Sequence, residues 1–251
     1  YKLTIDETID IFLGVDIKYN ETFTAVKTSM ATKIMELQQI LSLTDMKQVN
    51  DPLPLNFDAT PLPADHVNYH EPFQTIYGKI LFISNYRPDI SVAKTKLAPI
   101  MHKWGRAHWD ALLHLSKYLV QTADDGMFLQ RSESWRVTET KCFAITDAGE
   151  IANPDNTSRA IIGHVIFIEN NIISFGSKLT SCVATESSHG ELIGIYKVVQ
   201  RITAMLNLFV SLHPITLSKP IKIYGDNLAS LWIARTRGNS TRTKHYNLKL
   251  H

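Results

Sequence analysis

The stretch 221–232, IKIYGDNLASLW, predicts a short strand, an acid at its tip and then a helix. Its isoleucines and Tyr224 favour a strand, Gly225 marks a tight exit, and an amphipathic helix follows through Trp232. Asp226 therefore stands at the carboxyl end of a strand, where α/β proteins gather their ligand-binding groups. On this stretch alone the simpler interpretation is that Asp226 caps the helix, because Asp is a favoured N-cap residue.

The region upstream predicts the rest of a mixed sheet. Its apolar residues recur with period 2, and three runs read as strands: 142–147, 160–168 and 172–177. The last two form a hairpin around 169–171. A helix then runs from about Ser187 to about Val210. Because crossover connections are right-handed, this helix lays the strand at 221–224 parallel to the first strand.

Three acids occupy matching places in this arrangement. Asp147 ends the first strand, Asp226 ends the fourth, and Glu191 lies in the first turn of the crossover helix. Each could separately be a cap or a surface charge. Together they would converge on one point, where they repel one another and need cations. Ligands that are all oxygen suit Mg²⁺ or Mn²⁺, and two such ions about 4 Å apart support phosphodiester cleavage.

Composition limits the alternatives. The chain has 251 residues, of which 44% are hydrophobic and 20% charged, and its net charge is +2, all ordinary for a globular protein. Segment 235–251 holds five basic residues and no acid, which suits a polyanion or a solvated tail. Cys142 and Cys182 form no Cys-x-x-Cys pair, so we expect two buried, reduced thiols in an intracellular protein. We expect no signal peptide and no membrane span, since no apolar run approaches about 18 residues.

The first half of the chain predicts an α+β arrangement. Runs 9–17 and 22–26 are strand-like, and a helix capped by Thr28 or Ser29 follows them. The proline-rich segment 50–68 reads as a linker, and 69–122 reads as helices interrupted at Arg87-Pro88-Asp89. We expect three segments, with bounds 1–66, 67–135 and 136–251.

Residues 141–251 resemble the RNase H domain of copia-type LTR retrotransposon polyproteins. The resemblance rests on short motifs in order: Asp147-Ala148, Ser158-Arg159, the run 172–178, Val183-Ala184, Ser187-Ser188-His189-Gly190-Glu191, Tyr224-Gly225-Asp226-Asn227 and Arg242-Thr243-Lys244-His245. Upstream, FLGVDI at 12–17 looks like the end of the family's polymerase palm, and 69–93 looks like its helical thumb and connection. The resemblance thus implies the end of a palm and a helical thumb/connection, followed by an RNase H-like mixed five-stranded sheet with helices. The family's paired-Asp polymerase motif is absent and is expected just before Tyr1.

The resemblance also implies an activity, which is metal-dependent hydrolysis of the RNA strand of an RNA–DNA hybrid with two Mg²⁺ or Mn²⁺ ions. Asp147, Glu191 and Asp226 match the family's first three acids. The position of the fourth metal ligand holds Asn247, which offers a carbonyl oxygen and no charge. We therefore expect weaker binding of one ion and reduced or absent turnover. His245 is a candidate for product release, for phosphate contact or for packing.

The resemblance further implies the partners. Arg242, Lys244 and Lys178 are candidates for contact with the nucleic acid, since basic groups hold a backbone without reading sequence. The other implied partners are the remaining parts of the Pol polyprotein, namely the polymerase fingers and palm and the integrase. A homodimer is compatible with the family, and a membrane is not expected. The implied location is the cytoplasm, in a virus-like particle, or the nucleus.

Other interpretations stay open. The chain could be a decayed or domesticated copy that acts as a nucleic-acid-binding or protein-interaction scaffold, and Asn247 favours this reading. The RNase H unit could also serve only as a structural part of a larger assembly. His164 is better explained as a packed histidine than a catalytic one. Core packing is likewise the better interpretation for the tryptophans of the helical region and beside it, Trp104, Trp109 and Trp135.

Overall fold

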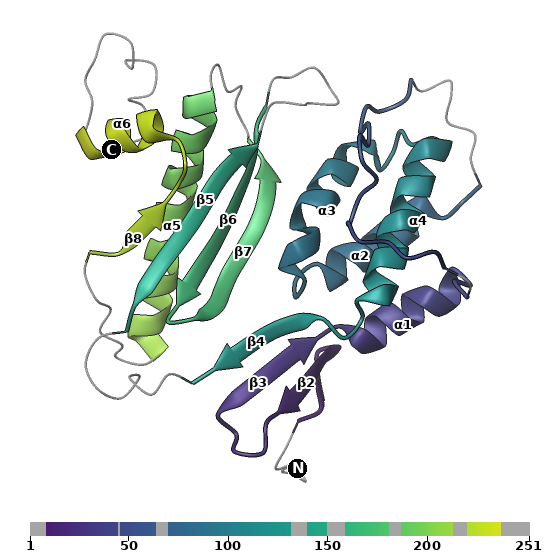
Figure 1. Ribbon diagram of the computed structural model, residues 1–251, viewed down its shortest axis with the longest axis horizontal. Coiled ribbons are helices and arrows are strands. Elements are labelled where there is room, and N and C mark those ends of the chain that lie inside the picture. Colours follow the sequence, from purple (N-terminus) through teal and green to yellow (C-terminus); the bar gives the residue numbers. More distant parts are fainter. Residues whose placement is uncertain are drawn as a thin grey trace. The chain divides into compact units, whose positions relative to one another are not determined.

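The computed structural model describes residues 9–44, 46–63, 70–131, 140–149, 159–180, 187–212 and 220–236 (Figure 1). The chain divides into two compact units, Tyr1–Arg131 and Ser132–His251. The segments expected at 1–66 and 67–135 therefore share one unit, apart from residues 132–135. The boundary expected at the proline-rich segment does not separate two compact bodies.

The first unit contains an antiparallel sheet with the strand order β1-β2-β3-β4. Its strands are β1 (Ile11–Phe12), β2 (Val15–Tyr19), β3 (Ala25–Ser29) and β4 (Gly126–Gln130). Leu13 and Gly14 join the first two with φ of 51° and 80°, the left-handed region that tight hairpin turns use. Strand β4 lies beyond the range 69–122 that reads as helices, in a part of the expected segment 67–135 where no strand was predicted.

Helix α1 (Ala31–Ile40) begins without the expected cap. Thr28 and Ser29 lie in β3 and pair with β4, so neither is free to cap a helix. Asp16 of β2 supplies the cap instead, because its carboxylate accepts hydrogen bonds from the backbone N–H and the hydroxyl of Thr32. An acid at this end also matches the positive pole of the helix.

The remaining helices of the first unit enclose its core. They are α2 (Phe73–Ile83), the short η2 (Pro88–Ile90), α3 (Ser91–Leu97), η3 (Ala98–Ile100) and α4 (Arg106–Gln121). Phe73 stacks on Trp104 with ring centroids 5.2 Å apart, and Trp109 lies 6.2 Å from Trp104. Both tryptophans are buried, which confirms the prediction of core packing for them; Trp135 lies outside the described residues.

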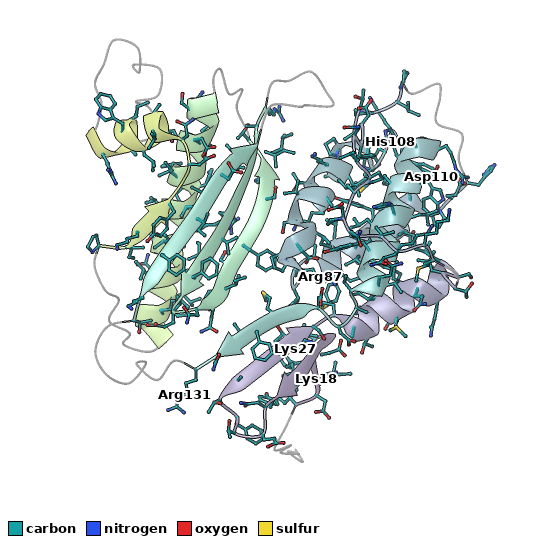
Figure 2. All side chains as sticks on the ribbon, in the orientation of Figure 1. Lys18, Lys27, Arg87, His108, Asp110 and Arg131 are labelled. Carbon is teal, nitrogen blue, oxygen red and sulfur yellow. The ribbon has the colours of Figure 1, made fainter. Side chains whose placement is uncertain are left out.

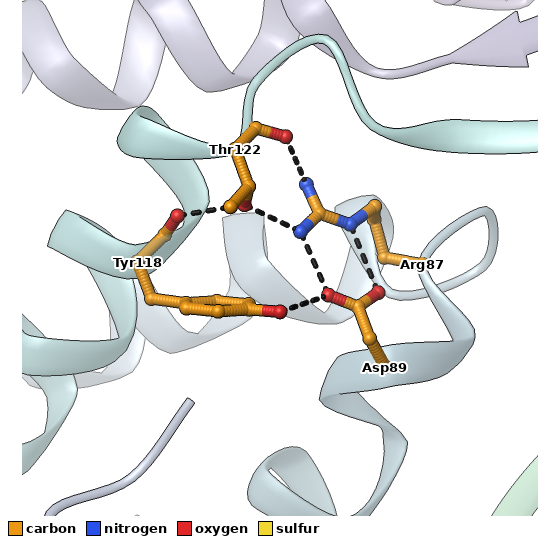
Figure 3. Close-up of polar contacts among 4 residues, drawn as sticks. All are labelled: Arg87, Asp89, Tyr118 and Thr122. Atoms are coloured by element: carbon orange, nitrogen blue, oxygen red, sulfur yellow. Dashed lines mark hydrogen bonds and ion pairs between the residues drawn. The ribbon is translucent and has the colours of Figure 1, made fainter. Parts of the chain in front are cut away.

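The expected break at Arg87-Pro88-Asp89 is a buried polar network (Figure 3). The Arg87 guanidinium, whose residue is 1% exposed, donates two hydrogen bonds to the Asp89 carboxylate, at 2.9 and 2.7 Å. It also donates to the backbone oxygen and the hydroxyl of Thr122, the residue after α4, and the Tyr118 hydroxyl donates to Asp89. This network joins the start of η2 to the end of α4.

The second unit is a mixed sheet with the order β7-β6-β5-β8 (Figure 1). Strands β5 (Cys142–Gly149), β6 (Ile161–Ile168) and β7 (Asn171–Leu179) form an antiparallel meander, and β8 (Lys222–Tyr224) pairs parallel to β5. Helices α5 (Ser187–Leu212) and α6 (Leu228–Thr236) precede and follow β8. The predicted strands, hairpin and parallel fourth strand are confirmed. The described residues contain four strands of this sheet, and a fifth is not among them. The arrangement is compatible with an RNase H-like fold in general and is not specific to it.

One face of this sheet packs against α5. Val198 and Ile202 of the helix share a core with Cys142, Ala144 and Ile166, and burial raises the pKa of the Cys142 thiol. By length and composition the stretch Ser188–Phe209 could also span a membrane. Core helices of soluble proteins pass the same test, so this is weak support for a span. Cys182 lies outside the described residues.

Candidate metal centre

The pairing of β5 with β8 brings two of the predicted acids together. Ile145 lies opposite Tyr224 in this parallel pair, so Asp147 and Asp226 are each two residues beyond matched positions. Parallel strands lie about 4.8 Å apart, which places the two acids at the same edge of the sheet. Both side chains are exposed.

Helix α6 is capped by Asn227 and not by Asp226. The Asn227 side-chain oxygen accepts a hydrogen bond from the backbone N–H of Ser230 at 3.0 Å, the usual N-cap arrangement. The interpretation of Asp226 as the helix cap, which was the simpler one on the sequence, is therefore wrong. Its carboxylate is left at the strand end.

Glu191 reaches the same point from the first turns of α5. The residue is only 3% exposed, and its Oε1 atom accepts a hydrogen bond from the backbone N–H of Ala148 at 3.0 Å. This bond fixes the carboxylate beside the end of β5. The other oxygen, Oε2, is buried and has no hydrogen-bond partner within the described part of the chain.

The three carboxylates form one cluster. Each of Asp147, Glu191 and Asp226 offers one oxygen, and these oxygens all lie within 4.8 Å of one another. Burial raises the pKa of Glu191 to about 7, the hydrogen bond from Ala148 opposes this, and the negative charges of Asp147 and Asp226 add to it. A divalent cation would relieve both the repulsion and the unpaired oxygen, so the residues present fit a metal ion.

The close fit of α5 on β5 positions Glu191. A Cβ added at Gly194, one turn along the helix, would lie 2.8 Å from the hydroxyl oxygen of Thr146, the residue before Asp147. That hydroxyl donates to the backbone oxygen of Gly163 at 3.0 Å and is held in place. Neither this contact nor the hydrogen bond from the N–H of Ala148 could be predicted from the sequence. A backbone donor leaves no trace in residue type, and the glycine inside a helical pattern was the one available signal.

The other predicted site residues divide into two groups. Lys178 is exposed on β7 and lies opposite Ile162, whose other neighbour is Ala148, so it is at the same end of the sheet as Asp147, two strands away. Arg242, Lys244, His245 and Asn247 lie outside the described residues. Their roles stay predictions.

His164 lies next to the site in the sheet, on the face that packs against α5. It pairs with Thr146 and Gly176, whereas Asp147 follows Thr146 and projects to the opposite face. Burial lowers the pKa of His164 to about 4, with a further contribution from Arg201, so the ring is neutral. This agrees with its interpretation as a packed histidine.

Comparison with known proteins shows that the chain is similar in sequence to Pol polyproteins from plant transposons. No family model matches. The chain is 24% identical over 245 residues to the retrovirus-related Pol polyprotein from transposon RE2 of Arabidopsis thaliana, and 23% identical over 183 residues to that from transposon TNT 1-94 of Nicotiana tabacum. It is also 27% identical over 184 residues to an uncharacterized mitochondrial protein of Arabidopsis thaliana, covering 73% of this chain and 72% of that protein. The alignments cover 98% of the chain for RE2 and 72% for TNT 1-94, but only 16% and 13% of the polyproteins. These likenesses support descent from a copia-type Pol polyprotein.

Proposed function

We propose that this retrotransposon-derived chain carries the RNase H portion of a reverse transcriptase, which hydrolyses the RNA strand of an RNA–DNA hybrid with divalent metal ions. The observation that carries the proposal is the meeting of Asp147, Glu191 and Asp226 within 4.8 Å, from two parallel strand ends and one helix. Oxygen-only clusters of this kind suit Mg²⁺ or Mn²⁺.

Each acid has a distinct part in this proposal. Asp147 and Asp226, both exposed, offer oxygens on the solvent side, where a phosphodiester can approach. Glu191 keeps one oxygen on the N–H of Ala148 and offers the other from the buried side. Bound Mg²⁺ or Mn²⁺ would supply the Lewis acidity that generates a hydroxide nucleophile and stabilises the leaving oxygen.

The basic residues complete the proposed site. Arg242, Lys244 and Lys178 would hold the phosphate backbone of the hybrid, and His245 would assist product release. Asn247, in the place of a fourth acid, offers an oxygen without charge, so one of two ions would bind more weakly and turnover would fall. As part of a Pol polyprotein, the chain would work beside the polymerase and integrase, in a cytoplasmic virus-like particle or the nucleus.

Cleavage of a labelled RNA–DNA hybrid, measured in Mg²⁺ and in Mn²⁺, tests the proposal. The unaltered chain is compared with Asp147→Asn and Asn247→Asp, both of which preserve side-chain size. We expect metal-dependent cleavage that Asp147→Asn abolishes and Asn247→Asp increases. Silence of all three folded proteins would overturn the proposal.

A catalytically impaired remnant that acts as a scaffold is the second candidate, and Asn247 is the observation that favours it. Its signature in the same experiment is an inactive unaltered chain whose cleavage is restored by Asn247→Asp. That outcome would mean that the fold and the acids are intact and that the missing charge disables this copy.

A further inference from the structure

Residues 46–63 of the first unit form a strap, a segment without helix or strand that lies along α4. The side chain of Gln121, the last residue of α4, accepts a hydrogen bond from the backbone N–H of Val49 at 2.8 Å. It also donates to the carbonyl oxygen two residues before Val49, again at 2.8 Å. At the other end, the N–H of Leu62 donates to the carbonyl oxygen of Lys103, just before α4, at 2.9 Å. The strap therefore runs antiparallel to the helix.

Two histidines of α4 hold the middle of the strap. The Nε2 atom of His114 lies 2.9 Å from the carbonyl oxygen of Asp51 and donates to it, because a carbonyl oxygen can only accept. His108 is 5% exposed and forms a hydrogen bond with the backbone of Asp58. Its ring also meets the ring of Phe57 edge-on, with centroids 6.2 Å apart. Side chains of the helix thus satisfy backbone polar groups of the strap.

The contacts of His108 require a neutral ring. Its Nδ1 atom accepts a hydrogen bond from the backbone N–H of Gly105 at 3.0 Å, in a buried position at the start of α4. A neutral imidazole has one acceptor and one donor, so Nε2 carries the proton and donates to the carbonyl oxygen of Asp58. Protonation would place a hydrogen on Nδ1, against the N–H of Gly105, and break that bond. His114 differs, because its Nε2–H donates to a carbonyl oxygen in either form.

The surroundings of His108 favour the neutral ring. Burial lowers the pKa of His108 below its ordinary value of 6.5, and the charge of Asp58 on the strap opposes this more weakly. The buried residues of α1 and α3 include no ionisable side chain, and α2 buries Tyr77, whose pKa of about 12 keeps it neutral. Figure 2 labels His108 and, toward the other end of α4, Arg87. Two groups of charged side chains along α4 pair among themselves: Arg106 with Asp110 and Glu71, and Arg87 with Asp89.

We propose that His108 is a pH-sensitive switch, whose neutral ring holds the strap on α4 and whose protonated ring releases it. In the released state the ring is in water and its pKa is the ordinary 6.5, whereas in the held state its pKa is lower. The strap is therefore held fully above pH 6.5, and its release increases as the pH falls below that value. Leu53 and Phe57, which pack against the helical core, leave it with the strap. The switch lies in the first unit and needs no metal ion, so it goes beyond the proposed hydrolysis.

Hydrogen exchange of the full chain, measured at single amides at pH 7.5 and pH 5.5, tests this inference. The probes are the N–H groups of Val49 and Leu62, whose acceptors lie on α4 and just before it. Their protection, corrected for the intrinsic exchange rate at each pH, should fall roughly 5- to 10-fold between the two values. The amides of α2 should change much less. Equal falls in the strap and in α2 would mean acid unfolding of the whole unit and would overturn the proposal.

Matched variants identify the histidine that responds. His108→Asn keeps an oxygen acceptor near the position of Nδ1 and is neutral at every pH, so strap protection should no longer depend on pH. A weaker hold by asparagine would lower protection equally at both pH values and leave their ratio near 1. His114→Gln keeps a donor near the position of Nε2 and should leave the pH dependence in place. A dependence that survives in His108→Asn, or disappears in His114→Gln, would contradict the proposed switch.

Discussion

At the scale of the residue, burial and the charges of two neighbouring acids make a negative charge on Glu191 unfavourable. Its pKa is about 7, against an ordinary value of 4.5, because it is buried and because two more acids are close. Between those values the folded chain holds a proton that the unfolded chain releases. This group's stabilising contribution is therefore complete below about pH 4.5 and is lost as pH rises through 7.

This linkage predicts the effect of Glu191→Gln, which is neutral at every pH. In EDTA, the free energy of unfolding of the variant relative to the unaltered chain should increase by on the order of 3 kcal/mol between pH 4 and pH 8. Urea unfolding followed by circular dichroism measures it. Asp147→Asn removes one neighbouring charge and should give part of the same change. A difference that does not vary with pH would contradict the raised pKa.

At the scale of the element, the packing of α5 against β5 decides where Glu191 lies. Alanine favours a helix over glycine by about 1 kcal/mol, yet a Cβ at Gly194 would meet the Thr146 hydroxyl at 2.8 Å. Overpacking of a core costs about 1–3 kcal/mol, so it should outweigh the helical gain. We expect Gly194→Ala to destabilise the chain and to weaken Mn²⁺ binding by displacing Glu191.

A double-mutant cycle isolates this contact. Thr146→Ala removes the blocking oxygen at the cost of its hydrogen bond to Gly163, about 1 kcal/mol. In that background Gly194→Ala should become stabilising by about 1 kcal/mol. The unfolding free energies of the four proteins give the coupling. Additive effects would show that the close approach does not limit the packing.

The elements that could be predicted from the sequence are of two kinds. Some have a local pattern of apolar residues, and others follow from the right-handedness of crossover connections. Alternating residues revealed β5 and β6, and the right-handed crossover placed Asp226 beside Asp147. Strand β4 was missed because its five residues, GMFLQ, pair with a strand about a hundred positions earlier, as in the contact of Thr28 with Met127. No local pattern encodes such a partner. The capping of α1 by Asp16 was missed for the same reason.

At the scale of the whole molecule, the three expected segments became two compact units because β4 closes the first sheet. The chain leaves β3, passes through all the helices of the first unit and returns to pair with the same strand. Composition marked a linker at 50–68, since prolines discourage regular structure. What composition does not reveal is that Leu53 and Phe57 of that segment pack against the helical core.

The buried polar network of Arg87 joins the start of η2 to the end of α4, just before the chain returns to β4. Arg87→Ala would remove the guanidinium that donates to the carbonyl of Thr122 and to the carboxylate of Asp89. Breaking a fully buried ion pair costs about 3–5 kcal/mol, and because the Asp89 side chain is 34% exposed we expect about 2–4 kcal/mol. Arg87→Lys should recover little, since an ammonium cannot form the paired bonds of the guanidinium. Urea unfolding followed by the fluorescence of the buried Trp104 and Trp109 measures the loss.

An exposed ion pair on the surface of α4 is a matched control for Arg87→Ala. Asp110 pairs with Arg106 at 3.1 Å, and the two side chains are 54% and 64% exposed. Exposed pairs of this spacing contribute about 0.3–0.5 kcal/mol, so Asp110→Ala should change the free energy of unfolding by no more than that. Similar costs for Arg87→Ala and Asp110→Ala would mean that burial adds nothing to the Arg87 network. A several-fold larger cost for Arg87→Ala would show that this buried contact ties the returning chain to the core of the first unit.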